Sequence, residues 1–192
     1  AASALKKKDL KDLTDATHFD EAEVVAIYDH FRSIASRGGG GEDAMDRASF
    51  LQSLNVKGSV FLDRVFAIID TDRDGKISFA AYLAGLSVLC ARGTLNEKSD
   101  FAFRLYDFDA DGKISKQELS DMLQWSLEES EVKVTPAQVA SIIAETFRQA
   151  DRNGDGFIDP AEFKALVDKD PGILSSVTLD FKNMMTEAAE KA

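Results

Sequence analysis

A twelve-residue pattern occurs three times in this chain of 192 residues, and no other feature constrains the fold as strongly. The copies begin at Asp70, Asp107 and Asp151, and each has oxygen-bearing side chains at positions 1, 3 and 5, glycine at 6 and isoleucine at 8. A phenylalanine stands four residues before each copy, and apolar residues continue at helical spacing on both sides. The repeat therefore predicts helix–loop–helix units and an all-α fold.

The loop residues are of the types that bind a hard cation such as Ca²⁺, which takes about six to eight oxygen ligands. Glycine at position 6 permits a sharp turn, position 7 offers its backbone carbonyl, and a glutamate at position 12 supplies two oxygens. Two copies are complete, and their predicted ligands are Asp107, Asp109, Asp111, Lys113, Ser115 and Glu118, and Asp151, Asn153, Asp155, Phe157, Asp159 and Glu162. An acidic surface turn is the alternative interpretation, but three copies in phase favour ion binding.

The copy that begins at Asp70 lacks the glutamate, because Ala81 stands at position 12. Its remaining candidate ligands are Asp70, Asp72, Asp74, Lys76 and Ser78. Mg²⁺ keeps several waters and tolerates this loss better than Ca²⁺ does. We therefore expect two tight Ca²⁺ sites in the chain and a possible third site that is empty or holds Ca²⁺ or Mg²⁺ weakly.

A fourth, degenerate copy lies upstream. Phe31 and Ile34 match the end of an entering helix, Met45 matches the isoleucine at position 8, and Phe50 matches the apolar residue after a loop. The intervening chain is three residues longer than the other loops and contains four glycines, residues 38–41. We predict a helix pair that packs but binds no ion. A phosphate-binding loop is disfavoured, because no Lys-Ser/Thr follows the glycines.

Paired units imply two lobes of helices. The predicted boundaries are an N-terminal helical extension over 1–17, an N-lobe over 18–92, a C-lobe over 93–169 and a C-terminal helix over 170–192. Thr135 and Pro136 are predicted to start one helix as N-cap and first residue. A capping sequence at residues 159–162 is predicted to start another.

The composition excludes several functions. The formal net charge of −11 disfavours nucleic acid and anionic membranes as partners. No apolar run approaches the roughly 18 residues of a membrane span, and the chain's single cysteine, Cys90, allows no internal disulfide. We find no nucleophile–base pair, so an enzyme is not expected. The predicted location is the cytoplasm.

The arrangement resembles the EF-hand calcium sensors built like calcineurin B. Residues 63–66, 86–88, 103–107 and 171–179 are similar to plant calcineurin B-like proteins, whereas residues 10–14, 45–50 and 92–98 are similar to calaxin, an axonemal dynein calcium sensor. The resemblance implies two lobes of paired EF-hands, in which the first of the four EF-hands is degenerate. It also implies a sensor that regulates a kinase- or phosphatase-type target or an axonemal dynein complex. The second possibility extends the predicted location to the cilium or flagellum.

Such sensors open an apolar groove that takes an amphipathic helix of the target protein. The candidate groove residues are Phe101, Leu105, Met122, Leu123, Trp125, Leu166 and Val167 in the C-lobe, and Phe61, Leu83, Leu86 and Leu89 in the N-lobe. The same helical spacing is also typical of core residues. A calcium buffer and a constitutive structural subunit of a ciliary complex are the alternative functions.

Overall fold

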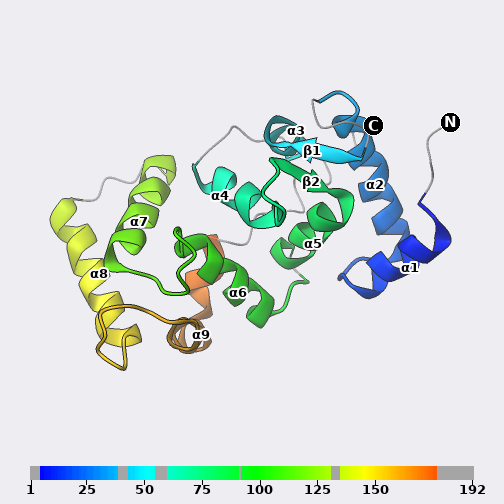
Figure 1. Ribbon diagram of the computed structural model, residues 1–192. Helices are drawn as coiled ribbons and strands as arrows, with labels where there is room; N and C mark the ends of the chain where they lie inside the picture. The colour runs from blue at the N-terminus through cyan, green and yellow to red at the C-terminus, as the bar shows by residue number, and fades with distance from the viewer. Residues whose placement is uncertain (1–4, 39–42, 55–59, 91, 131–134, 177–192) are drawn as a thin grey trace. The chain divides into compact units, whose positions relative to one another are not determined.

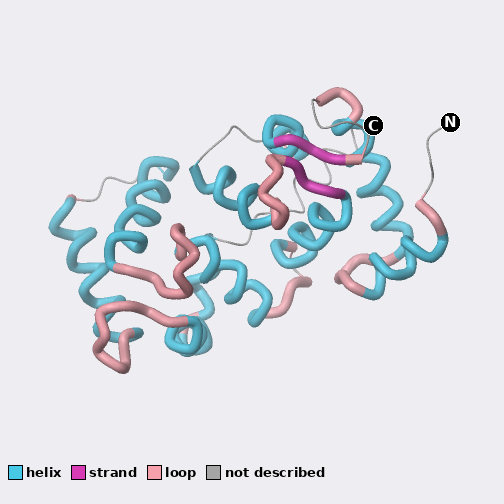
Figure 2. The backbone as a smooth tube through the Cα atoms, viewed as in Figure 1, coloured by secondary structure: helices cyan, strands magenta, loops and turns pink. Residues whose placement is uncertain are grey.

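The computed structural model describes residues 5–38, 43–54, 60–90, 92–130 and 135–176, and these are mostly helical, with loops and one short sheet between the helices (Figures 1 and 2). They form two compact units, the first ending at Gly93 and the second beginning at Thr94. Most of the predicted C-terminal helix, residues 177–192, lies outside the described residues, and residues 171–176 form a 3₁₀ helix. Across the described residues, no helix is both long enough and apolar enough to cross a bilayer.

The N-terminal unit contains two helix pairs joined by a short sheet. Its elements are α1 (Lys7–Asp15), α2 (Glu21–Ala35), β1 (Ala44–Asp46), α3 (Arg47–Ser53), α4 (Val60–Ile69), β2 (Lys76–Ser78) and α5 (Phe79–Leu89). Strands β1 and β2 are antiparallel, with Met45 opposite Ile77 (Figure 2). This confirms the prediction that Met45 occupies position 8 of the degenerate copy.

Aromatic side chains from both helix pairs build the core of the N-terminal unit. Phe31 on α2 contacts Tyr82 on α5 with ring centroids 5.4 Å apart, and Phe50 on α3 contacts Phe66 on α4 at 5.6 Å. Burial raises the pKa of Tyr82 to about 12, and its hydroxyl donates to Ser53 Oγ at 3.2 Å. The degenerate helix pair therefore keeps its packing role, as the sequence predicts.

The C-terminal unit contains the two complete loops. Its elements are α6 (Leu95–Tyr106), α7 (Lys116–Ser130), α8 (Pro136–Ala150), α9 (Pro160–Lys169) and the 3₁₀ helix η1 (Pro171–Ser176). Helix α6 packs against α9, and α7 packs against α8. Phe103 on α6 meets Phe163 on α9 edge to face, with ring centroids 5.7 Å apart. These phenylalanines flank loops that are far apart in sequence, so the contact joins the two helix–loop–helix units.

Both predicted capping signals start helices. Thr135 accepts the N–H of Gln138 at 3.3 Å, and the Gln138 side chain accepts the N–H of Thr135 at 2.9 Å. Asp159 and Glu162 make the same reciprocal pair at the start of α9. Such caps satisfy N–H groups that have no partner inside the helix.

Candidate calcium-binding loops

We number the loops by their order in the chain: loop 1 (35–49), loop 2 (70–81), loop 3 (107–118) and loop 4 (151–162). In loop 3, single oxygens of Asp107, Asp109 and Glu118 all lie within 4.8 Å of one another, the only such carboxylate group found in the described part of the chain. Ala110 and Gly112 have φ of +58° and +86°, which turn the backbone sharply between these side chains. Three convergent carboxylates are a donor set that fits Ca²⁺.

Glu118 closes loop 3 by bonding to its other end. One carboxylate oxygen accepts the N–H of Phe108 at 2.8 Å, and the other accepts the N–H and the hydroxyl of Ser115 at 2.7 and 2.8 Å. Burial opposes the ionisation of Glu118, but these donors outweigh it and hold its pKa below the usual value. Glu118 is therefore ionised and spans the loop from the first turn of α7.

Asp107 starts loop 3 in a buried position. It is 6% exposed, and its carboxylate accepts the N–H groups of Asp111 and Gly112 at 3.1 and 3.0 Å. Burial raises the pKa of Asp107, and the negative charges of Glu118 and Asp111 act in the same direction. A cation placed among these side chains would relieve their mutual repulsion.

Loop 4 repeats the bonding pattern of loop 3. Glu162 accepts the N–H groups of Arg152 and Asn153 at 2.8 and 3.2 Å, and its other oxygen accepts the N–H of Asp159 at 3.0 Å. Asp151 accepts the N–H of Gly156 at 3.0 Å. The side chain at position 12 therefore bridges both ends of each complete loop.

Loops 3 and 4 are joined through backbone and side chain. Ile114 and Ile158, the residues at position 8, exchange two backbone hydrogen bonds of 2.9 Å. The ammonium of Lys113 reaches across this bridge to Asp155 Oδ2 at 2.9 Å and lies 5.1 Å from the centroid of the Phe157 ring. The hydrogen bond from Lys113 holds the pKa of Asp155 below its usual value. Asp155 is a predicted ligand of loop 4, so a residue of one loop neutralises a ligand of the other.

Loop 2 shows what is lost without a carboxylate at position 12. Asp70 still accepts the N–H of Gly75 at 2.9 Å, and Ser78 still caps the following helix by accepting the N–H of Ala81 at 3.3 Å. The N–H of Thr71 bonds to the carbonyl of Ile69 at 2.9 Å, whereas the equivalent N–H groups of loops 3 and 4 bond to glutamates. Loop 2 therefore has the same backbone turn as the other loops, but no side chain at position 12 bridges its two ends.

Loop 1 keeps only the second half of this geometry. Asp46 accepts the N–H of Ser49 at 2.8 Å and caps α3 as Ser78 caps α5. Its first residues, Ala35, Ser36 and Arg37, bring no carboxylate. Residues 39–42 lie outside the described residues.

Most candidate groove residues lie in the core of their own unit. In the C-terminal unit, Leu105 and Val167 are fully buried and Phe101 is 6% exposed, while in the N-terminal unit Leu83 is fully buried. Trp125 is half-buried and meets Phe108 of loop 3 edge to face, with ring centroids 5.0 Å apart. Within each unit, the apolar faces of the helices pack against one another. Each unit is therefore closed in this conformation.

The sequence does not predict the Lys113–Asp155 pair, because the loop pattern assigns a role at position 7 to the backbone carbonyl and none to the side chain. The available signal was the charge of Lys113, which precedes the isoleucine that pairs the loops and contrasts with Phe157 at the same position of loop 4.

Comparisons with known proteins agree with the loop geometry. The family model described as "EF hand" matches residues 62–80 and 142–167, and the one described as "EF-hand domain" matches residues 100–128. The chain is similar to a recoverin family protein of Dictyostelium discoideum (30% identity, covering 88% of this chain and 84% of the relative). It is also similar to the calcineurin B protein of Naegleria gruberi (31%, covering 84% and 88%) and to calcineurin B-like protein 5 of Arabidopsis thaliana (31%, covering 92% and 88%). None of these comparisons tests the predicted likeness to calaxin.

Proposed function

Because this chain belongs to the EF-hand calcium sensors of the calcineurin B and calcineurin B-like type, we propose that it binds Ca²⁺ through loops 3 and 4 and then engages an amphipathic helix of a target protein. The observation that carries the proposal is the position of Glu118 and Glu162. Each bridges the two ends of a loop from the first turn of the exiting helix.

The side chains of loops 3 and 4 supply the ligands. Ca²⁺ brings a hard divalent charge that is satisfied by about six to eight oxygens in a relaxed geometry. Asp107, Asp109 and Glu118 already present oxygens within 4.8 Å of one another. Loop 2 has no carboxylate at position 12, and we propose for it only a weak Ca²⁺ or Mg²⁺ site.

Glu118 and Glu162 link ligand binding to helix position. In the closed unit their oxygens accept backbone N–H groups, so a carboxylate that turns to a cation must exchange those bonds. Each glutamate is fixed in the first turn of its helix and cannot move far without that turn. Loop closure on an ion would therefore rotate α7 and α9 against α6 and α8.

Rotation of these helices would expose apolar side chains that are now buried. Phe101 and Met122 are 6% and 7% exposed in the closed unit, and Leu166 is 9% exposed. Methionine side chains adapt to varied partners, and an amphipathic helix can lay its apolar face into a hydrophobic groove. We propose this surface as the groove for a target helix.

The target class follows from the relatives' names. Several are named as calcineurin B proteins, including those of Naegleria gruberi and Schizosaccharomyces pombe, which favours a regulatory, non-catalytic role beside a phosphatase- or kinase-type target. The axonemal dynein complex, and with it a ciliary location, stays a prediction from sequence. The cytoplasm is the location proposed for the protein with a phosphatase- or kinase-type target.

A hydrophobic fluorescent dye and a 20-residue amphipathic peptide of leucine and lysine test the proposal on the full chain. With Ca²⁺, we expect dye fluorescence to rise and the peptide to bind, and Glu118→Gln with Glu162→Gln should abolish both responses. The control variant, Asp121→Asn with Asp168→Asn, removes two carboxylates from the same helices outside the loops and should respond normally.

Two results would contradict the proposal. Calcium binding without dye or peptide binding would indicate a buffer. Equal peptide binding with and without Ca²⁺ would indicate a constitutive structural role.

A further inference from the structure

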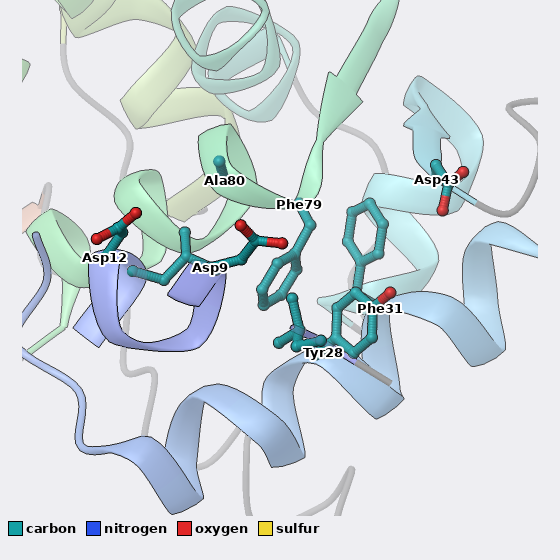
Figure 3. Close-up of a pocket in the computed structure, with 9 residues that line it drawn as sticks. Asp9, Asp12, Tyr28, Phe31, Asp43, Phe79 and Ala80 are labelled. Atoms are coloured by element: carbon teal, nitrogen blue, oxygen red, sulfur yellow. The ribbon is translucent and has the colours of Figure 1, made fainter. Parts of the chain in front are cut away.

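A pocket of about 370 Å³ lies in the N-terminal unit, outside the carboxylate clusters of loops 3 and 4 (Figure 3). It lies where the consecutive helices α1 and α2 meet the start of α5, which is distant in sequence, and Asp43, just before β1, also lines it. Its lining includes three aromatic side chains and three carboxylates, those of Tyr28, Phe31, Phe79, Asp9, Asp12 and Asp43. Neither the loop chemistry nor the proposed groove uses this space.

The floor of the pocket is aromatic. The ring centroids of Tyr28 and Phe79 are 4.8 Å apart, and those of Phe31 and Phe79 are 5.4 Å apart, both edge to face. Phe31 is fully buried and Phe79 is 8% exposed, so the rings are fixed by packing. The guanidinium of Arg32 lies 5.9 Å from the centroid of the Tyr28 ring, which shows that this ring already takes a cation on one side.

The rim of the pocket is acidic. Asp9 lies beside Phe79, and Asp12 and Asp43 lie on opposite sides of the aromatic group in Figure 3. All three residues are exposed, and none of their carboxylates makes a hydrogen bond or ion pair with a described residue. The rim therefore offers negative charge that no cation of the described chain neutralises by direct contact.

The aromatic floor and the acidic rim together indicate which chemical class of ligand fits the pocket. The three carboxylates do not converge within 4.8 Å of one another as those of loop 3 do, which disfavours a divalent metal ion. Their charge also repels phosphate and anionic lipid. An aromatic floor below separated carboxylates suits a cationic group that is joined to an apolar one. The volume is at the lower end of the range of about 300–1,000 Å³ for ligand pockets.

We propose that this pocket docks a partner peptide segment in which arginine or lysine stands next to leucine or an aromatic residue. The apolar side chain packs on Tyr28 and Phe79, and the cation lies between the rim carboxylates. None of the lining residues is a predicted ligand of loop 3 or 4, so this contact does not require Ca²⁺ and does not rest on the proposed function. It would hold a partner to the N-terminal unit at resting calcium.

The probe is the peptide acetyl-Leu-Arg-Leu-Arg-amide, titrated into the ¹⁵N-labelled full chain with a calcium chelator present. We expect binding with a Kd on the order of 0.1–1 mM and amide shifts centred on Tyr28 and Phe79. Asp9→Asn with Asp12→Asn should weaken binding about 3- to 10-fold. The matched control, Glu21→Gln with Asp29→Asn, removes two charges from the same unit outside the pocket and should change the Kd less than about 2-fold.

Two further peptides separate the contribution of the positive charge from that of the apolar side chains. Acetyl-Leu-Glu-Leu-Glu-amide should not bind, and acetyl-Gly-Arg-Gly-Arg-amide should bind more weakly than the leucine–arginine peptide.

Several results would overturn the proposal. These are no binding of the leucine–arginine peptide, shifts centred outside the pocket, or equal loss of affinity in both double variants. Self-association of the free chain that the peptide reverses would instead assign the pocket to a second copy of the chain.

Discussion

Removal of the positive charge of Lys113 should strengthen calcium binding by loop 4. The ammonium lies 2.9 Å from Asp155 Oδ2, and Asp155 is a predicted ligand at position 5 of that loop. A cation that binds loop 4 must displace this ammonium or share Asp155 with it. Lys113→Met removes the competing charge while it keeps a side chain of similar length and the backbone carbonyl that loop 3 is predicted to use.

The exposure of the pair sets the size of the effect. The side chains of Lys113 and Asp155 are 44% and 37% exposed, so water and salt screen their attraction. Exposed pairs of this kind change an equilibrium by a small factor, and we expect the loop 4 affinity to rise about two- to five-fold. The gain should shrink in about 0.5 M KCl, where the screening length is only a few ångströms.

Calorimetric titration of the full chain in a Glu118→Gln background measures loop 4 while loop 3 is disabled. Lys116→Met is the matched control, because it removes the same charge from the start of α7, where the ammonium lies 5.3 Å from the centroid of the Phe147 ring. An equal gain in both variants would show that only the net charge matters. An unchanged affinity in Lys113→Met would refute the competition between Lys113 and calcium.

Three further predictions concern the N-terminal unit. Ala81→Glu should add one calcium equivalent to the calorimetric stoichiometry, because it restores the carboxylate that loop 2 lacks; an unchanged stoichiometry would place the defect elsewhere in that loop. Gly85→Ala should lower the free energy of unfolding by about 1–3 kcal/mol in denaturant titration, because its Cβ would lie 2.5 Å from Ile69 Cδ1, and full stability would contradict this close packing. The hydrogen bond from Arg92 lowers the pKa of Glu23, so their pair stabilises the unit above the unfolded-state pKa of about 4.3 and is lost as pH falls through the folded pKa. Arg92→Met should therefore lower the Tm by about 1–4 °C at pH 7 and by less near pH 3, where only the hydrogen bond from Arg92 to the carbonyl of His18 is lost, as measured by circular dichroism; an equal loss at both pH values would exclude the ion pair as the cause.

Much of the fold follows from local sequence. The twelve-residue spacing sets the loops, and isoleucine or methionine at position 8 identifies the residues that pair, as Met45 and Ile77 do. The capping residues Thr135 and Asp159 act over three positions, so their effect can be predicted from neighbours alone. The arrangement of the candidate ligands within one loop is predictable for the same reason, because it depends on residues that are close together in the sequence.

Features that depend on distant segments were not predictable. The Lys113–Asp155 pair needs two loops aligned through Ile114 and Ile158, and the pocket beside Tyr28 needs α1 to pack on α2. Helical spacing also could not separate core from groove for residues such as Leu105, because a closed unit buries the same face that an open unit would present.

Calcium titration of the full chain by calorimetry shows whether loops 3 and 4 are the calcium sites. We expect two equivalents in the sensor range of roughly 10⁻⁷–10⁻⁵ M. Glu118→Gln and Glu162→Gln should each weaken one of them sharply, because a neutral amide cannot replace a bidentate carboxylate. The absence of any site of that strength, three equally tight sites, or full affinity in both variants would contradict the assignment of calcium binding to these two loops.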